Sequence, residues 1–553
     1  MNGYISDLKG FLSNKKYMAV MLVVALLSYG FAMTHVTVSI DDLELDRYLG
    51  SGQDMLRSGR LGHILWNFLR TRWANSYSIE FLGVILFLWA AISFSILYRR
   101  VSGGQVSMEA CTVFSGVLIS YPLINEIWEY TRTGFNVCGG YLLVARSVLL
   151  VYNFLHSGKR NYVQMLIAGL LTMWICSGYE SLASVYVFTV CSVLALQVIY
   201  GPEKEKHISQ VLLQGMVYAI VLAVGLLLRA VSHNILLAIL HLEPSTNGST
   251  KILWGTEPAA VILKNLVWDI LRGYILRGII YFPLGELLAA GVLFLIIGVC
   301  ACRKHGAVLL LPGAGMLLSL ILLSVLQGDM SPYRTCQVFG SFVAFTAMLA
   351  VICVQRVNWR RLRWIPAGVC ALGCVLSLYQ AIYLNSFLFM NHLRSEEEAF
   401  VVRDVGTDLL AANLQDKPVI FIGEYSLSNM IEKAVSIPTD SRAWQSYCKW
   451  FDRCANYLGD DFYSDFYYSR LPETNVNSVL SWSLQGFEQE TTQKIFSFYG
   501  IEYTPVDNEA YYGLYPQANA YAREHDMPAY PQEGYIVDMG EYLIVRLGEN
   551  LLE

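Results

Sequence analysis

The chain has 553 residues, of which 55% are hydrophobic and 15% are charged, and its mean hydropathy is +0.43. This composition is too apolar for a soluble protein of that length and indicates that a lipid bilayer is the solvent for much of the chain. The net charge of −5 provides no basic surface, so we expect no nucleic-acid partner.

Apolar runs recur from the amino terminus to residue 390. A helix needs about 20 apolar residues to cross the hydrocarbon of a bilayer, because its backbone polar groups must be paired within the segment. The segments that approach this length are residues 17–38, 79–98, 108–124, 138–155, 162–178, 181–200, 208–228, 279–301, 306–326, 336–355 and 364–390. We therefore expect a polytopic α-helical membrane protein with about 11 transmembrane helices. Lysines precede the first segment but no small-residue cleavage site follows it, so we expect a retained signal anchor.

Basic residues in the short connections set the expected orientation. If the amino terminus is cytoplasmic, every basic turn lies on the cytoplasmic side, as the positive-inside rule requires. The basic residues of these turns are Arg99, Arg100, Lys159, Arg160, Lys204, Lys206, Arg303, Lys304, Arg356, Arg360, Arg361 and Arg363. An odd number of spans then places the carboxyl terminus outside.

The opposite side carries the longer loops. Long ordered loops are usually functional, so we expect an extracytoplasmic site roofed by them. These loops are residues 39–78, 125–137, 229–278 and 327–335. Two of them contain helical periodicity, around 61–69 and 262–274, which is typical of interfacial amphipathic helices.

The tail differs from the rest of the chain. Its patterning becomes that of a soluble protein near Ser395, and we expect residues 391–553 to form an extracytoplasmic α/β domain that follows the transmembrane region 1–390. Cys448 and Cys454 lie there, where a disulfide between them is left open.

Three stretches of the tail have recognisable patterns. Pro418–Gly423 reads as a buried strand, residues 491–499 as a helix, and residues 534–547 as two strands joined by a Met-Gly-Glu turn. We find no phosphate-binding glycine loop and no Ser-His-Asp signature in this region.

The sharpest cluster of ionisable residues follows the first apolar segment. Asp41, Asp42, Glu44 and Asp46 gather within six residues of the sequence SIDDLELDRYLG. Four crowded carboxylates repel one another, which favours a general base or a metal ligand at the membrane surface. The alternative is the solvated start of a loop.

Aromatic and acidic residues also gather at the outer ends of later segments. Flat rings beside carboxylates are typical of a sugar-binding site, although aromatic rings at a membrane rim are often only interfacial belts. These residues are Glu126, Trp128, Glu129 and Tyr130 after the third segment, and Tyr179 with Glu180 between the fifth and sixth.

Several arginines complete the set of candidate functional residues. Arg146 falls near the middle of the fourth segment, where a charge is costly and usually faces a cavity or a partner. Arg334 and Arg60 lie on the expected outer side, where guanidinium groups could clamp a phosphate. Structural pairing of Arg146 and interfacial anchoring of the other two are the alternatives.

The order of these motifs resembles that of the bacterial Gtr type-two glucosyltransferase family, which uses polyprenyl-phosphate sugars and belongs to the GT-C superfamily. The matching elements, in chain order, are Asp41-Asp42, Gly59-Arg60, Asn125-Glu126, Trp128-Glu129-Tyr130, Tyr179-Glu180, Pro332 with Arg334 and Gly340, and the closing segment YIVDMGEYLIVRLG. One departure is that Arg47 lies further from the acidic pair than the arginine of the family pattern does.

This resemblance implies a GT-C-like catalytic region in the bacterial cytoplasmic membrane. A hexose, in this family glucose, would pass from undecaprenyl phosphate to a cell-envelope glycan or glycolipid, with inversion. Asp41 or Asp42 would be the general base, and Arg334, Arg146 or Arg60 would stabilise the departing phosphate. The remaining acidic and aromatic residues would contact substrate. No metal ligand and no obligate cofactor is implied, although a divalent cation on Asp41 and Asp42 is left open.

Other functions fit parts of the pattern. A lipid-linked glycan flippase would also have many spans and intramembrane charges, but it should show inverted repeats and short outer loops, which we do not find. A structural subunit that binds cell-wall polymer would leave the acidic cluster and Arg146 unexplained. A glycan polymerase or ligase is the nearest enzymatic alternative.

Overall fold

The computed structural model divides the chain into two compact units, Met1–Val36 with Arg47–Leu388 and Thr37–Asp46 with Phe389–Glu553. The structure describes residues 2–38, 53–69, 76–128, 131–157, 161–202, 207–245, 252–276, 278, 282–357, 364–411, 417–423, 449 and 489–548.

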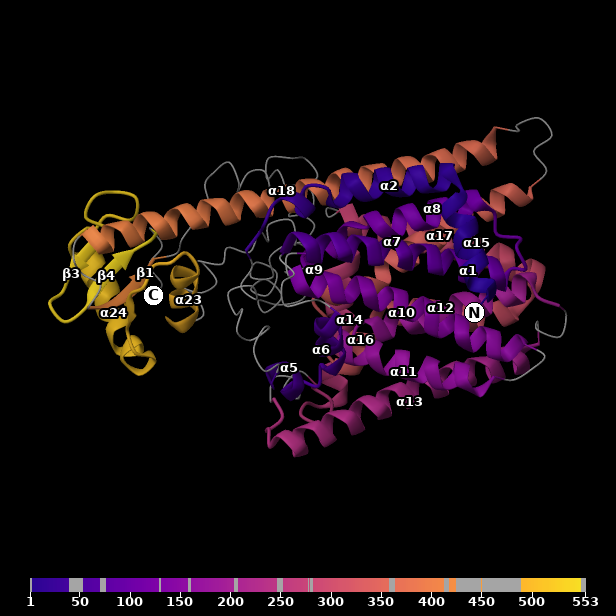
Figure 1. Cartoon of the computed structure of the whole chain (residues 1–553), viewed down its shortest axis with the longest axis horizontal. Coiled ribbons are helices and arrows are strands. Elements are labelled where there is room, and N and C mark those ends of the chain that lie inside the picture. Colours follow the sequence, from indigo (N-terminus) through magenta and orange to yellow (C-terminus); the bar gives the residue numbers. More distant parts are fainter. Residues whose placement is uncertain are drawn as a thin grey trace. The chain divides into compact units, whose positions relative to one another are not determined.

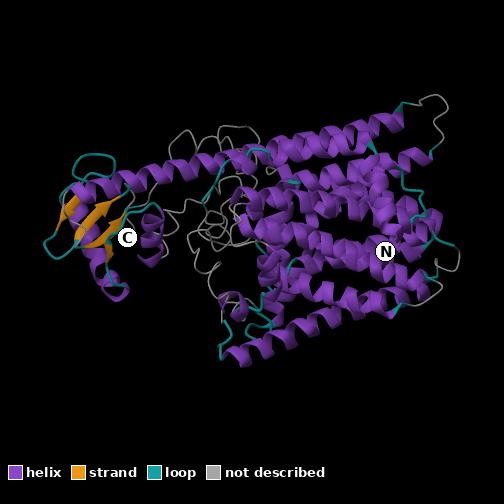
Figure 2. Ribbon diagram, viewed as in Figure 1, coloured by secondary structure: helices purple, strands orange, loops and turns teal. Residues whose placement is uncertain are grey.

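The first unit is built from helices, which Figures 1 and 2 show as ribbons. Its α-helices are α1 (Asn2–Ser13), α2 (Lys15–Tyr29), α5 (Gln53–Arg57), α6 (Leu61–Leu69), α7 (Ser76–Val101), α8 (Met108–Ser120), α9 (Asn125–Trp128), α10 (Thr131–His156), α11 (Tyr162–Gly178), α12 (Leu182–Tyr200), α13 (Ile208–Leu240), α14 (Ala259–Ile270), α15 (Phe282–His305), α16 (Leu310–Gln327), α17 (Gln337–Arg356) and the first part of α18 (Ile365–Ala411). Short η segments lie between them: η1 (Ala32–Thr34), η2 (Pro122–Ile124), η5 (Leu271–Leu276), η7 (Ala307–Leu309) and η8 (Tyr333–Thr335).

Local sequence explains where several of these helices begin and end. The side chain of Asn14 accepts a hydrogen bond from the Tyr17 backbone N–H at the start of α2, and Ser107 does the same for Ala110 in α8. Such caps satisfy backbone donors that a helix leaves unpaired in its first turn. At the other end of a helix, Gly328 follows α16 with a φ of 79°, a left-handed conformation that favours glycine.

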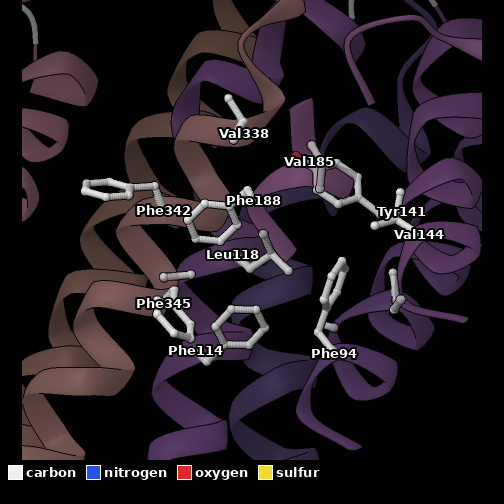
Figure 3. Packing of buried hydrophobic residues seen from close by; sticks show 14 of the residues in the cluster. Phe94, Phe114, Leu118, Tyr141, Val144, Val185, Phe188, Val338, Phe342 and Phe345 are labelled. Carbon is white, nitrogen blue, oxygen red and sulfur yellow. The ribbon is translucent and has the colours of Figure 1, made fainter. Parts of the chain in front are cut away.

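The core of the first unit lies where α7, α8, α10, α12 and α17 pack together. Phe94, Phe114, Phe188 and Phe345 point toward one another there, as Figure 3 shows. The rings of Phe188 and Phe345 meet edge to face, with centroids 5.8 Å apart. Because lipid is as apolar as these side chains, close packing rather than exclusion of water holds such helices together.

The expected membrane-spanning helices are present, and the chain is a multi-pass membrane protein. Within the described residues, nine helices are long and apolar enough to cross a membrane, and the bent pair α1 and α2 makes a tenth if it is counted as one span. The difference from the expected eleven lies at α11, which is apolar but only 17 residues long. The amphipathic helices expected near residues 61–69 and 262–274 are α6 and α14.

The second unit contains a four-stranded sheet of order β2-β1-β4-β3, drawn in orange in Figure 2. β1 (Pro418–Ile422) pairs in parallel with β2 (Thr504–Pro505) and β4 (Leu543–Arg546), whereas β3 (Ile536–Asp538) pairs with β4 in antiparallel fashion. Val419 and Phe421 face the end of α18 and α23 (Gln489–Phe498), and Ile420 and Ile422 face α24 (Asn508–Glu524). Because successive side chains of β1 point to opposite faces of the sheet, its continuous apolar run buries both faces.

The expectations for the tail are confirmed at three places. The strand at Pro418–Gly423 is β1, the helix near 491–499 is α23, and the stretch 534–547 forms the hairpin of β3 and β4. The sequence reasoning did not identify α24. Its packed positions follow helical spacing, but most of them are tyrosines and alanines, which are less apolar than the residues that marked the other helices; they are Tyr511, Leu514, Tyr515, Ala518, Tyr521 and Ala522. Cys448 and Cys454 lie outside the described residues.

Candidate active site

The acidic loop and part of the aromatic cluster lie outside the described residues. This applies to Asp41, Asp42, Glu44 and Asp46, and to Glu129 and Tyr130. The predicted site residues that the structure does describe lie on or beside several helices of the first unit.

The chain just before the acidic loop is held by α18 within the second unit. The backbone N–H of Val38 donates to Ser395 Oγ at 3.1 Å, and the carbonyl of Val38 accepts from Arg394 Nη2 at 2.8 Å. Arg394 also pairs with Glu398 at 3.1 Å, and both side chains are almost fully buried. Val38 is three residues before Asp41, so this buried ion pair holds the described segment that precedes the acidic loop.

Glu126 and Arg334, which lie more than 200 residues apart in sequence, are brought together by the packing of α9 against η8. The carboxylate of Glu126 lies near the backbone N–H of Arg334, and the guanidinium of Arg334 is close enough to act on the same carboxylate electrostatically. Asn125 supports this turn because its side-chain oxygen accepts from the Glu126 backbone N–H at 2.7 Å. Arg334 is exposed whereas Glu126 is partly buried, so the guanidinium has room for an anionic partner.

The carbonyl of Arg334 is held by side chains from two other elements. Tyr179 donates its hydroxyl to this carbonyl at 3.4 Å, and Gln337 donates its amide to the same oxygen. Ser181 in turn donates to Gln337 Oε1 at 2.5 Å. The structure therefore brings three of the predicted residues, Glu126, Tyr179 and Arg334, into one cluster.

Glu180 takes part in a neighbouring contact. It forms an ion pair with Arg229 of α13, and Arg229 also donates from Nε to the carbonyl of Gly59 at 3.4 Å. Gly59 precedes the exposed Arg60 and has a φ of 71°, so the turn between α5 and α6 rests on this pair. Half-exposed ion pairs contribute little stability, about 0–1 kcal/mol. The effect of the Glu180–Arg229 pair is to fix the backbone next to Arg60.

Two predicted residues lie apart from this cluster. Trp128 is buried, with its ring on that of Tyr29 at a centroid distance of 4.7 Å, which makes it a packing residue in the structure. The guanidinium of Arg146 lies over the ring of Tyr4, 3.6 Å from its centroid, and near Arg100. Arg146 is thus directed toward α1 and the end of α7, and the structure does not bring it to Arg334.

A buried polar network that the sequence reasoning did not identify lies in the same unit. Gln380 of α18 donates to Glu286 of α15 at 2.9 Å, and Ser120 of α8 donates to Gln380 at 2.8 Å. Within the described part of the chain, the second carboxylate oxygen of Glu286 is buried without a hydrogen-bond partner. An acidic residue inside an apolar run was the signal that could have identified Glu286, because intramembrane charges are usually functional.

The cluster of Glu126, Tyr179 and Arg334 contains an exposed guanidinium and a carboxylate that partly neutralises its charge. The phenol of Tyr179 holds the Arg334 backbone. This arrangement can bind an anionic oxygen such as that of a phosphate. Over the described ranges, no group of three or more His, Cys, Asp or Glu side chains is placed to hold a metal ion.

Comparison with known proteins gives one match. The model of a family described as Glucosyl transferase GtrII matches residues 30–352 of this chain. The matched region runs from the end of α2 to near the end of α17, so it includes the acidic loop and every residue of the cluster. No curated protein and no solved structure matches the chain.

Proposed function

The chain belongs to the glucosyl transferase GtrII family, and we propose that it transfers glucose from a polyprenyl-phosphate carrier to a cell-envelope glycan or glycolipid outside the bacterial cytoplasmic membrane. The observation that carries this proposal is the exposed Arg334 guanidinium beside Glu126. A polyprenyl-phosphate donor needs a cation at the point where its phosphate departs, and a multi-pass membrane protein can hold the lipid between its helices.

The proposed reaction is a single displacement with inversion. Asp41 or Asp42 removes the proton from the acceptor hydroxyl, whose oxygen forms a bond to the anomeric carbon of glucose. The bond between that carbon and the phosphate oxygen breaks on the opposite face, and the electron pair leaves with the polyprenyl phosphate. A general base of this kind contributes about a hundredfold to ten-thousandfold in rate.

Arg334 is the proposed phosphate ligand. Tyr179 and Gln337 hold its backbone, so the guanidinium approaches the leaving group from a fixed turn. Arg60, which lies next to the Glu180–Arg229 pair, is proposed as a second cation toward the same phosphate. Arg146 is not included, because its guanidinium lies on Tyr4. The leaving group is a phosphomonoester, which needs less neutralisation than a diphosphate, so the proposal has no obligate metal.

The remaining predicted residues have a secondary place in the proposal. Glu44, Asp46, Glu129 and Tyr130 are proposed to contact the acceptor, together with Glu126 and Glu180. Trp128 supports the site from the core through its packing on Tyr29.

The proposal can be tested with purified protein, radiolabelled polyprenyl-phosphate glucose and cell-envelope acceptors. We expect transfer of label, its loss in Asp41→Asn or Asp42→Asn, and a drop of a hundredfold or more in Arg334→Gln, since a removed electrostatic stabiliser costs about 10²–10³ in rate. Lys264→Gln, which removes an exposed cation of α14, is the matched control and should keep full activity.

Two results would contradict the proposal. Full activity in both aspartate variants would remove the base assignment, and unchanged activity in Arg334→Gln would remove the phosphate clamp. A donor panel tests the carrier: transfer from a polyprenyl-diphosphate oligosaccharide but not from the monophosphate glucose would indicate a polymerase or ligase instead.

A further inference from the structure

A large cavity lies at the end of the first unit opposite to the Glu126–Arg334 cluster. It has a volume of about 880 Å³ and is bounded by α12, α15, α16 and α17. Arg334 lies just before α17 begins, whereas the cavity is lined by Arg356 at the last residue of that helix. At 1.5 Å per residue, the length of α17 separates the two by roughly 30 Å. The cavity is therefore not part of the candidate active site.

The walls of this cavity are apolar, and its rim is basic. Phe294, Met316 and Leu349 are among the wall residues, and the rim carries Arg303, Lys304 and Arg356. Among the described residues that line the cavity, none is acidic. An apolar chamber of this size with cations at one edge suits a molecule that has an apolar body and an anionic head.

Two of the rim cations, from different helices, lie near the same residue of the lining. The guanidinium of Arg356 lies over the ring of Tyr200, 4.2 Å from its centroid, which fixes its position at the mouth of the cavity. Arg356 and Lys304 both lie close enough to interact with Cys353, a residue of the lining. Two cations from α15 and α17 thus share one edge.

The interior also has room for an apolar chain. Gly298 of α15 and Gly313 of α16 line the cavity, and a Cβ atom added to either would meet no atom of the described residues within 4 Å. The glycines therefore leave open space instead of serving close packing. Both helices belong to the least buried spans of the unit, so the cavity is accessible from the surrounding lipid.

We propose that this cavity binds an anionic phospholipid, with an acyl chain between α15 and α16 and the phosphate on Arg356 and Lys304. The rim lies at the end of the unit that the charge pattern predicts to be cytoplasmic. Basic pockets between transmembrane helices on that side are suited to anionic headgroups, because the guanidinium and ammonium donors pair with phosphate oxygens. Neutral lipids share the acyl chain but lack the net charge.

Native mass spectrometry of the full-length protein in detergent tests the proposal. Dioleoyl phosphatidylglycerol and dioleoyl phosphatidylcholine are added separately at equal concentration. We expect the anionic lipid to bind more tightly. The double variant Lys304→Gln, Arg356→Gln should weaken its binding by about fivefold for each cation removed. The matched control, Lys15→Gln with Lys16→Gln, removes two exposed cations at the start of α2 and should have no effect.

A second variant tests the apolar part of the site. Gly313→Leu fills the chamber but keeps the cations, and it should weaken phosphatidylglycerol binding. Gly291→Leu, also at a position open to a Cβ but outside the lining, should not. Equal binding of the two lipids, equal loss in the cation variant and its control, or unchanged binding in Gly313→Leu would each overturn the proposal. The last result would mean that the rim holds an anion without a lipid chain.

Discussion

The buried pair of Arg394 and Glu398 allows the positioning of the acidic loop to be tested separately from folding. In Arg394→Gln, the carboxylate of Glu398, whose side chain is 5% exposed, loses the guanidinium that lies 3.1 Å from it. Removing one partner of a buried ion pair costs about 3–5 kcal/mol. We expect this loss in the free energy of unfolding of the second unit, together with a reduction of glucosyl transfer because Val38 keeps its contact with Ser395 but loses the one with Arg394.

A double variant separates these two effects. Arg394→Met with Glu398→Leu removes both charges and keeps an apolar side chain at each position, so the buried charge is no longer uncompensated. The remaining cost is the lost partner of the Val38 carbonyl, about 1–3 kcal/mol. We therefore expect the double variant to be more stable than Arg394→Gln but still impaired in transfer.

Urea-dependent pulse proteolysis of the full-length protein in detergent measures the stability, and the radiolabel assay measures transfer. The reasoning would be refuted if the double variant were as unstable as the single one. It would equally be refuted if the double variant transferred glucose at the normal rate, because Arg394 would then have no positioning role.

Two further predictions concern packing and pH. Gly139→Ala places a Cβ 2.3 Å from the ring of Trp66, and this overlap should lower the free energy of unfolding, measured by heat or urea, by about 1–3 kcal/mol. The control is Gly134→Ala on the same helix, whose Cβ meets no described atom closer than 3.5 Å and should leave the stability unchanged. Equal effects of the two variants would contradict the packing argument. Burial, reinforced by a hydrogen bond to Asp408, raises the pKa of Tyr535 above the unfolded value of about 10. The neutral phenol of Tyr535 therefore stabilises the folded state fully below pH 10, and this stabilisation is lost as the pH rises through the folded pKa. Tyr535→Phe should lose about 1.5–3 kcal/mol at pH 8 and become less sensitive to alkali; an unchanged pH profile would argue against this role.

Sequence alone was sufficient for the class of protein, for the positions of its apolar helices and for three elements of the tail. Hydrophobic periodicity is a local property, so a run such as residues 208–228 already specifies a helix such as α13 without knowledge of its neighbours. The same holds for Pro418–Gly423, whose continuous apolar run predicts a strand with two buried faces. The order of short motifs along the chain was also enough to indicate the family.

Tertiary structure alone decided which of the candidate residues meet. Glu126 lies near Arg334 because α9 packs on η8, and Arg146 lies on Tyr4 because α10 passes near α1. Nothing in either local sequence distinguishes these partners. The side chains of Glu286 and Gln380 likewise find each other only through the packing of α15 and α18. A charged or polar group buried among apolar helices must take the partner that the packing brings within reach, and that choice is set by contacts between residues far apart in sequence.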